Sequence, residues 1–141
     1  MANGQLCDWE SKRARYAWER TGEAQRSLDD SFKDYANLAK SAPALIMNSG
    51  LMQTLAFLQS KDKQSKDKQS KDKHHQTLVN QICAWLWERF EALPDRPQGR
   101  AFEQVMDWLA QADGGRYRLA TREVMSLLRW IKQFAAAREE G

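Results

Sequence analysis

The chain has 141 residues, of which 42% are hydrophobic and 29% are charged, and its formal net charge is +3 at pH 7. We interpret residues 1–141 as one domain, because this length can bury a core without disulfides or metals. No apolar run reaches the roughly 20 residues that span a bilayer, and the first residues lack the apolar segment of a secretory leader. The two cysteines form no disulfide or zinc pattern. We therefore expect a reduced, cytoplasmic protein.

The positive net charge comes from one short segment. Residues 61–73 contain six lysines and three aspartates, which leaves 16 basic and 16 acidic residues in the rest of the chain. Overall basicity is therefore a weak indication of nucleic-acid binding. The distribution is a stronger one, because residues 116–132 contain five basic side chains and one acidic side chain, whereas residues 83–113 contain six acidic side chains and three arginines. Such a chain can attract RNA locally or stack head to tail with copies of itself.

We predict an all-α fold, a bundle of about six helices, because strand-like alternation is nearly absent and helix formers dominate. Pro43 suits the first turn of the third helix. Pro94 and Pro97 interrupt the chain after the fourth, and Gly114-Gly115 stops the fifth. The predicted helices span residues 6–26, 31–40, 43–60, 75–92, 99–111 and 119–138.

A tandem pentapeptide separates the third and fourth predicted helices. Residues 60–73 read S-K-D-K-Q, S-K-D-K-Q, S-K-D-K. The segment has no apolar residue, and a five-residue period forms no consistent helical face, so it cannot dock on a core. We expect a mobile Lys/Asp-rich loop at residues 60–74 or a frayed helix end, acting as a spacer. A lysine-rich arm that touches phosphates is the alternative.

The most specific pattern lies in residues 41–60, which contain A-P-x-x-I-x-x-x-G-L-x-Q-T-L-A-F-L. Gly50 interrupts this apolar run at a position where glycine costs a helix about 1 kcal/mol relative to alanine, so we expect another backbone or a ligand to approach it. The run resembles the signature helix of the small subunit of the Cmr complex, the type III-B CRISPR effector that silences RNA. Residues 12–17, 35–40 and 117–135 are similar to other segments of the same family, in the same order.

This resemblance implies a non-catalytic, structural and RNA-binding small subunit that acts in antiviral defence. Several copies would stack along the backbone filament and hold target RNA paired to the CRISPR RNA. The implied partners are the backbone subunit and the large polymerase-like subunit of the complex, the CRISPR RNA, the target RNA and neighbouring copies of the same chain. No membrane partner is expected.

Basic residues interleaved with aromatics suggest where RNA would bind. In the first helix Trp9, Arg13, Tyr16 and Arg20 fall within about 60° of each other. They offer phosphate contacts and stacking, or else the rings pack in the core and the arginine stems cover them. The resemblance favours a functional role for Arg13, which matches a basic position of the family.

In the last helix Arg122 and Arg129 are about 10.5 Å apart along the axis. They point away from the apolar face formed by Val124 and Ile131 and form a possible phosphate track, with an ordinary solvated face as the alternative. The predicted RNA-binding residues are Arg13, Arg20, Lys40, Gln53, Arg122, Arg129 and Lys132.

Six tryptophans are a further feature of the composition. Trp85 lies on the apolar stripe of its helix, so we expect it in the core. Trp87, Trp108 and Trp130 lie roughly 100–120° away from their stripes. These three are candidate protein-interface residues, although burial in a small bundle is an equal alternative.

No motif indicates catalysis. His74 and His75 are adjacent, so on a helix they point in different directions and do not form a metal pair. Phosphate-binding glycine loops and nucleophile motifs are absent. We expect no enzyme, cofactor or metal. Two other function classes remain open, a helical protein–protein adaptor without RNA contact and a small DNA-binding regulator.

Overall fold

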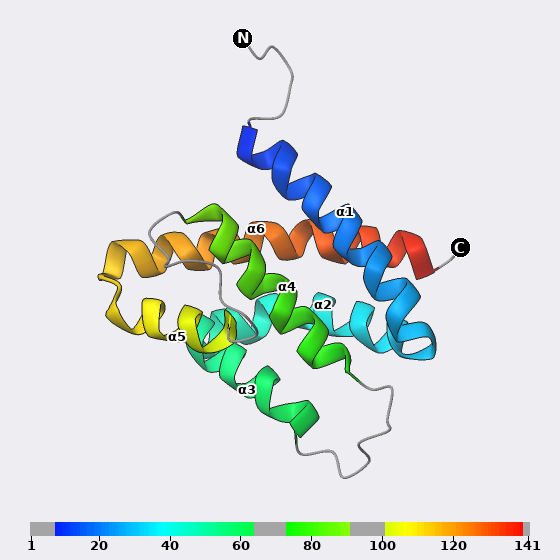
Figure 1. Cartoon of the computed structure of the whole chain (residues 1–141), viewed down its shortest axis with the longest axis horizontal. Helices are drawn as coiled ribbons and strands as arrows, with labels where there is room; N and C mark the ends of the chain where they lie inside the picture. Colours follow the sequence, from blue (N-terminus) through cyan, green and yellow to red (C-terminus); the bar gives the residue numbers. More distant parts are fainter. Residues whose placement is uncertain (1–7, 64–72, 91–100, 140–141) are drawn as a thin grey trace.

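The computed structural model describes residues 8–63, 73–90 and 101–139, and within these ranges the chain forms helices and no strand (Figure 1). The predicted all-α fold is confirmed. None of the helices in these ranges is long and apolar enough to cross a membrane. In chain order the elements are α1 (Asp8–Leu28), the 3₁₀ turn η1 (Asp29–Ser31), α2 (Phe32–Ser49), α3 (Leu51–Lys63), α4 (His74–Arg89), α5 (Ala101–Gln111) and α6 (Gly114–Glu139).

The helices share one hydrophobic core. α6 crosses the width of the molecule in Figure 1, α1 packs obliquely across it, and α2 packs beside it. α4 crosses in front of α6 and also packs against α2, α3 and α5. Trp85 on α4 and Tyr35 on α2 are among the largest fully buried side chains. The centre of the bundle therefore lies where α4 meets α2 and α6.

α2 and α3 divide at a different place from the predicted one. The sequence predicts a new helix at Pro43, but α2 runs through Pro43 to Ser49. Ala39, Ala42 and Ile46 are buried and continue one helical face across the proline. This packing outweighs the missing proline N–H and the cost of about 3 kcal/mol for proline inside a helix.

The break between the two helices lies at Gly50 instead. Its φ of 86° and ψ of 161° belong to a region that only glycine enters readily. Its N–H donates to the Ile46 carbonyl (2.8 Å), which closes the last turn of α2. Gly50 is therefore required by the backbone conformation of the turn, and the expected close approach of another backbone is not the reason for it.

α6 also begins earlier than predicted. The fifth helix ends at Gln111, as predicted, but the last helix, predicted to start at Leu119, begins at Gly114. The Asp113 carboxylate accepts the Arg116 N–H (2.8 Å), and the Asp113 carbonyl accepts the Tyr117 N–H (2.9 Å). Asp113 is thus an N-terminal cap, and the two glycines occupy the first turn of α6.

Some predictions fall outside the described residues. These are the repeat at residues 64–72, the breaks at Pro94 and Pro97, and the expected helix ends at residues 92 and 99. Within the described residues, α3 extends to Lys63, so the first pentapeptide begins as helix. α4 begins at His74, directly after the repeat.

Replacing Gly50 with alanine tests the turn between α2 and α3. We expect the free energy of unfolding to fall by about 1–3 kcal/mol, because alanine is strained at this φ and ψ. Urea or thermal unfolding measures the loss. Gly115→Ala is the matched control, since its added Cβ would meet only an ordinary contact 3.5 Å from the Asp113 carboxylate. It should leave stability unchanged or raise it by up to about 1 kcal/mol. Equal effects of the two substitutions would contradict this account of Gly50.

Candidate nucleic-acid interface

The exposed side of α6 carries four basic side chains. Arg118, Arg122, Arg129 and Lys132 are all exposed, and at 100° per residue they lie on one face of the helix. Val124 and Ile131 are fully buried on the opposite face, as the apolar pattern predicts. The two carboxylates of α6 within the described residues are Glu123, which is buried, and Glu139. We call the four basic residues the α6 basic face.

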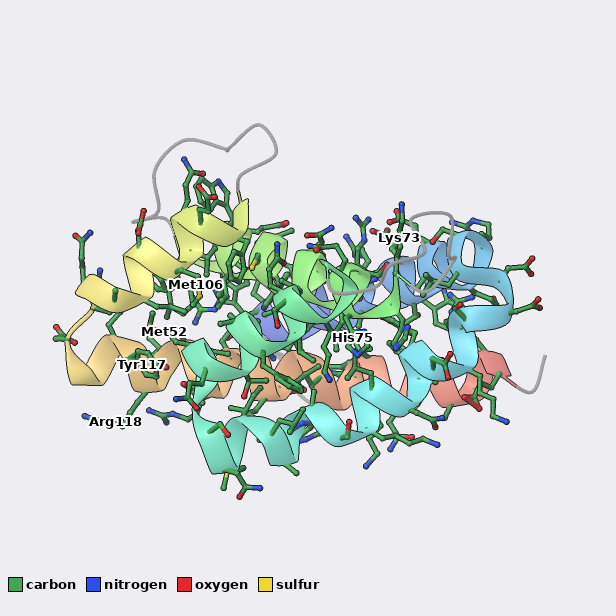
Figure 2. All side chains as sticks on the ribbon, turned by 90° about the horizontal axis from the view of Figure 1, so that it is seen from below. Met52, Lys73, His75, Met106, Tyr117 and Arg118 are labelled. Atoms are coloured by element: carbon green, nitrogen blue, oxygen red, sulfur yellow. The ribbon has the colours of Figure 1, made fainter. Side chains whose placement is uncertain are left out.

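Tyr117 anchors the beginning of this face. Its hydroxyl oxygen accepts the backbone N–H of Met52 (2.9 Å) in the first turn of α3. First-turn N–H groups have no partner inside their own helix. The Tyr117 hydroxyl therefore supplies an acceptor that α3 itself cannot provide. Figure 2 shows Tyr117 directed toward Met52, while Arg118 points away from the body of the molecule. Arg118 is absent from the predicted RNA-binding residues, although its spacing to Arg122 is one helical turn and could have revealed it.

Lys40 lies on α2, which packs against α6, and Gln53 lies on α3 beside Met52, which bonds to Tyr117 of α6. α2 and α6 run in opposite directions side by side (Figure 1), with Gly50 next to Tyr117. Lys40 lies ten residues before Gly50 and Arg129 twelve residues after Tyr117. At about 1.5 Å per residue these positions are at similar heights. Gln53 follows Met52 and is exposed near the start of α6.

The buried carboxylate of Glu123 fixes how α6 is rotated. It accepts two bonds from Arg13 on α1, from Nε (2.7 Å) and Nη2 (3.1 Å). It also accepts bonds from the Trp85 indole N–H (2.8 Å) and Arg89 Nε (3.1 Å) on α4. These four donors come from two helices, so Glu123 joins α1, α4 and α6 at one point.

The pKa of Glu123 depends on two opposing effects, its burial and its positively charged and hydrogen-bonding partners. Burial alone would raise the pKa of the carboxyl. Hydrogen bonds from Arg13 and Trp85, together with the charges of Arg13 and Arg89, outweigh burial, and the pKa is lowered. The carboxylate therefore stays ionised in the folded protein at neutral pH.

The predicted strip on α1 is brought together, but it faces α4. Trp9 and Tyr16 contact the buried ring of Trp85, with centroids 5.9 Å and 4.9 Å away. The Arg13 side chain is only 12% exposed in its bond to Glu123. This is the packed arrangement that the sequence left open. RNA contact by Arg13 and Arg20 stays a prediction.

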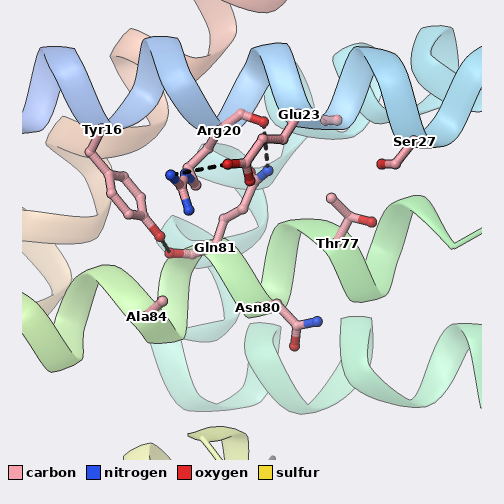
Figure 3. A pocket seen from close by; sticks show the side chains of 9 residues that line it. Tyr16, Arg20, Glu23, Ser27, Thr77, Asn80, Gln81 and Ala84 are labelled. Carbon is pink, nitrogen blue, oxygen red and sulfur yellow. Dashed lines mark hydrogen bonds and ion pairs between the residues drawn. The ribbon is translucent and has the colours of Figure 1, made fainter. Parts of the chain in front are cut away.

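Arg20 borders a groove of about 300 Å³ between α1 and α4, shown in Figure 3. Its guanidinium lies 3.2 Å from Glu23 and 3.6 Å from Glu19 and covers the Tyr16 ring. The Tyr16 hydroxyl donates to the Gln81 carbonyl (2.6 Å), and the Gln81 amide donates to the Arg20 carbonyl (3.1 Å). The polar groups of Tyr16, Arg20, Glu23 and Gln81 in this groove are therefore bonded within the chain.

The tryptophans divide between core and surface. Trp85 is 1% exposed, as predicted. The three predicted interface residues, Trp87, Trp108 and Trp130, are half-buried and pack against the core. Their role at an interface stays a prediction. Trp18, which the sequence analysis does not single out, is 49% exposed.

The described residues contain no cluster of three or more histidine, cysteine, aspartate or glutamate side chains that could hold a metal ion. Cys83 is buried, and burial raises the pKa of its thiol to about 12, so the reactive thiolate is scarce at neutral pH.

Comparison with known proteins gives a consistent match along the chain. The sequence model of the family CRISPR-associated protein (Cas_Cmr5) matches residues 9–138. The chain is 27% identical over 124 residues to the CRISPR system Cmr subunit Cmr5 of Thermus thermophilus, covering 88% of this chain and 90% of that protein. The crystal structure of a CRISPR-associated Cmr5 family protein from the same organism superposes with a TM-score of 0.67 at 25% identity. It covers 94% of this chain and 97% of the other.

Glu123→Gln tests the central carboxylate. At about pH 7 we expect the free energy of unfolding to fall by about 3 kcal/mol, because two guanidinium groups lose their shared partner. The folded pKa is below the unfolded one, so the stabilisation by Glu123 is present above the unfolded value near pH 4.3. It is lost as the pH falls through the folded pKa.

Urea unfolding should therefore show that the gap between the variant and the unmodified chain narrows below about pH 4. Glu19→Gln is the control, since its carboxylate is exposed and 3.6 Å from Arg20, and it should change stability by less than about 0.5 kcal/mol. A Glu123→Gln variant that unfolds at the same urea concentration as the unmodified chain would refute this role.

Proposed function

The chain belongs to the Cmr5 family of CRISPR-associated proteins and is thus a Cmr complex subunit, and from this premise we propose that it is non-catalytic and holds RNA by its phosphates. One observation supports the RNA contact more than any other. The α6 basic face presents Arg118, Arg122, Arg129 and Lys132 to solvent. The nearest carboxylate of the same helix, Glu123, is buried and bonded to other groups.

The spacing of the basic face suits a backbone contact. Arg118 to Lys132 spans about 21 Å along the helix, and the four side chains point to the same side. Arginine offers several donors in a fixed plane and binds phosphate oxygens well. Such contacts position a strand without reading its bases. In this proposal, sequence specificity comes from pairing between the CRISPR RNA and the target.

Lys40 and Gln53 widen the same surface. Lys40 is at the height of Arg129 on the adjoining helix, and Gln53 is near the start of α6; in this proposal both also contact the RNA strand. Arg13 and Arg20 already bond to carboxylates of this chain. The proposal therefore rests on α6 with its neighbours and does not require these two arginines.

We further propose that copies of the chain stack beside the backbone subunit and the large polymerase-like subunit of the complex, in the cytoplasm. The charge distribution supports this arrangement, because exposed carboxylates gather at α5 and the following turn, including Asp107 and Asp113. The basic side chains gather on α6. Complementary regions of this kind can orient neighbouring copies.

Reversing two charges on the basic face tests the RNA contact. We expect Arg122→Glu/Arg129→Glu, assembled in the Cmr complex with its CRISPR RNA, to bind target RNA at least about tenfold more weakly. The plot of log affinity against log salt should become shallower by about 0.7 for each phosphate contact that is lost. Filter binding of labelled target RNA across a salt series measures both quantities.

The control is Lys12→Glu/Arg26→Glu, which makes the same change of net charge at exposed positions on α1. It should leave the salt slope unchanged. An unchanged affinity and slope in the α6 variant, with assembly intact, would reject the phosphate contacts and favour an adaptor that binds proteins alone.

A further inference from the structure

An exposed tryptophan on α1 is held in one orientation by the end of α6. Trp18 is 49% exposed, and the guanidinium carbon of Arg138 lies 3.6 Å from the centroid of its ring. Phe134 meets the ring edge to face at 5.2 Å, and Trp130 stacks on Phe134 at 5.5 Å. We call these four residues the aromatic patch.

Arg138 is fixed by bonds as well as by stacking. Its Nε donates to the Thr21 hydroxyl (3.1 Å), and its Nη2 donates to the Trp18 carbonyl (2.9 Å). Its own carbonyl accepts the Gln25 side-chain amide (3.0 Å). The ordering of this arginine is therefore already part of the folded state. A ligand that stacks here loses less affinity to the ordering of side chains.

Gly22 provides the space that Arg138 occupies. It lies inside α1, where glycine costs about 1 kcal/mol relative to alanine. An added Cβ would lie 3.1 Å from Arg138 Nη2 and 3.3 Å from its Cζ, which is closer than ordinary contact. The chain thus has a helix-weakening residue at the position where the arginine crosses α1.

The surroundings of the aromatic patch favour an anionic partner. Arg15 lies one turn before Trp18, and Arg129 precedes Trp130. Both arginines are exposed. The carboxylate next in sequence to Trp18, Glu19, lies 3.6 Å from Arg20. The helical count places Glu139 on the far side of α6 from Trp130. Exposed Gln133 lies between the patch and the basic face.

The size of the aromatic patch favours a nucleotide over a protein. Only Trp18 among its rings is strongly exposed, whereas a stable protein interface buries about 800 Å² on each partner. The other strongly exposed large apolar residues of the described chain are Met47, Phe57 and Leu119. Met47 and Phe57 lie on α2 and α3. Leu119 is about 16 Å from Trp130 along α6, so it does not enlarge the patch.

We propose that the aromatic patch is a stacking site for an unpaired base of single-stranded RNA, next to the phosphate track on α6. This deepens the proposed function and rests on it. Tryptophan and arginine planes stack on any base, so the site adds affinity without sequence preference. Gln133 lies between the ring and Arg129 of the basic face, where the phosphate of the same nucleotide would be held.

Two strands that differ only in their bases test the proposal on the full chain. The probes are a labelled oligoadenylate of about ten nucleotides, within the usual site size of single-strand binding proteins, and an abasic strand with the same phosphates. We expect Trp18→Leu to bind the oligoadenylate about tenfold more weakly, within the range for loss of one stacked base. Binding of the abasic strand and the salt slope should be unchanged.

Gly22→Ala should weaken oligoadenylate binding in the same sense by displacing Arg138, while circular dichroism shows that the helices remain. Phe57→Leu is the control, since Phe57 is an exposed aromatic residue outside the patch, and it should leave both affinities unchanged.

Arg122→Glu/Arg129→Glu separates the two proposals, because it should weaken both strands. If it has no effect while Trp18→Leu behaves as expected, the phosphate track is wrong and the stacking site survives. Stacking is overturned if Trp18→Leu changes neither strand or both strands equally, or if the unmodified chain fails to bind the oligoadenylate. It is also overturned if, in the assembled Cmr complex, Trp18→Leu releases another subunit while RNA affinity is unchanged.

Discussion

The arrangement of this bundle depends on one buried carboxylate. Glu123 receives donors from α1 and α4 at a single point on α6. Burying a charge is unfavourable unless its partners are all present, so any rotation of α6 that separates Glu123 from Arg13 or Trp85 is opposed. The same constraint turns the opposite side of α6 outward. The basic face is exposed because the one carboxylate in the middle of α6 is held inside.

The spacing of apolar and charged residues predicts the features that depend on one helix alone. The apolar face of α6 and the outward direction of Arg122 and Arg129 follow from spacing alone. The predicted helix starts at Pro43 and Leu119 are wrong, since tertiary packing and an aspartate cap override the local preferences of proline and glycine. Spacing also brought Arg13 and Tyr16 to one strip of α1, but it does not say which neighbour that strip meets. The partner of Arg13 is 110 positions away in the chain.

The candidate site contains two residues that sequence patterns did not single out. Arg118 follows two glycines that predict the end of a helix, so the sequence pattern does not place it in the last helix. Trp18 was missed because the buried stripe of α1 consists of small residues such as Ala17, Thr21 and Ala24. Large apolar residues are the usual marker of a buried face. In α1 the large apolar residues lie on either side of the buried stripe of small residues. Only the position of that stripe shows that Trp18 points away from the core.

The contacts between the first and last helices have a consequence for synthesis on the ribosome. Arg13 bonds to Glu123, and Trp18 and Thr21 bond to Arg138 near the end of α6. Until α6 leaves the ribosome, the Trp85 indole and the guanidinium groups of Arg13 and Arg89 lack the Glu123 carboxylate to which they bond. Contacts of such long sequence separation form late. We therefore expect the bundle to close only after α6 has left the ribosome, so that ribosome-bound chains lacking α6 stay sensitive to proteases.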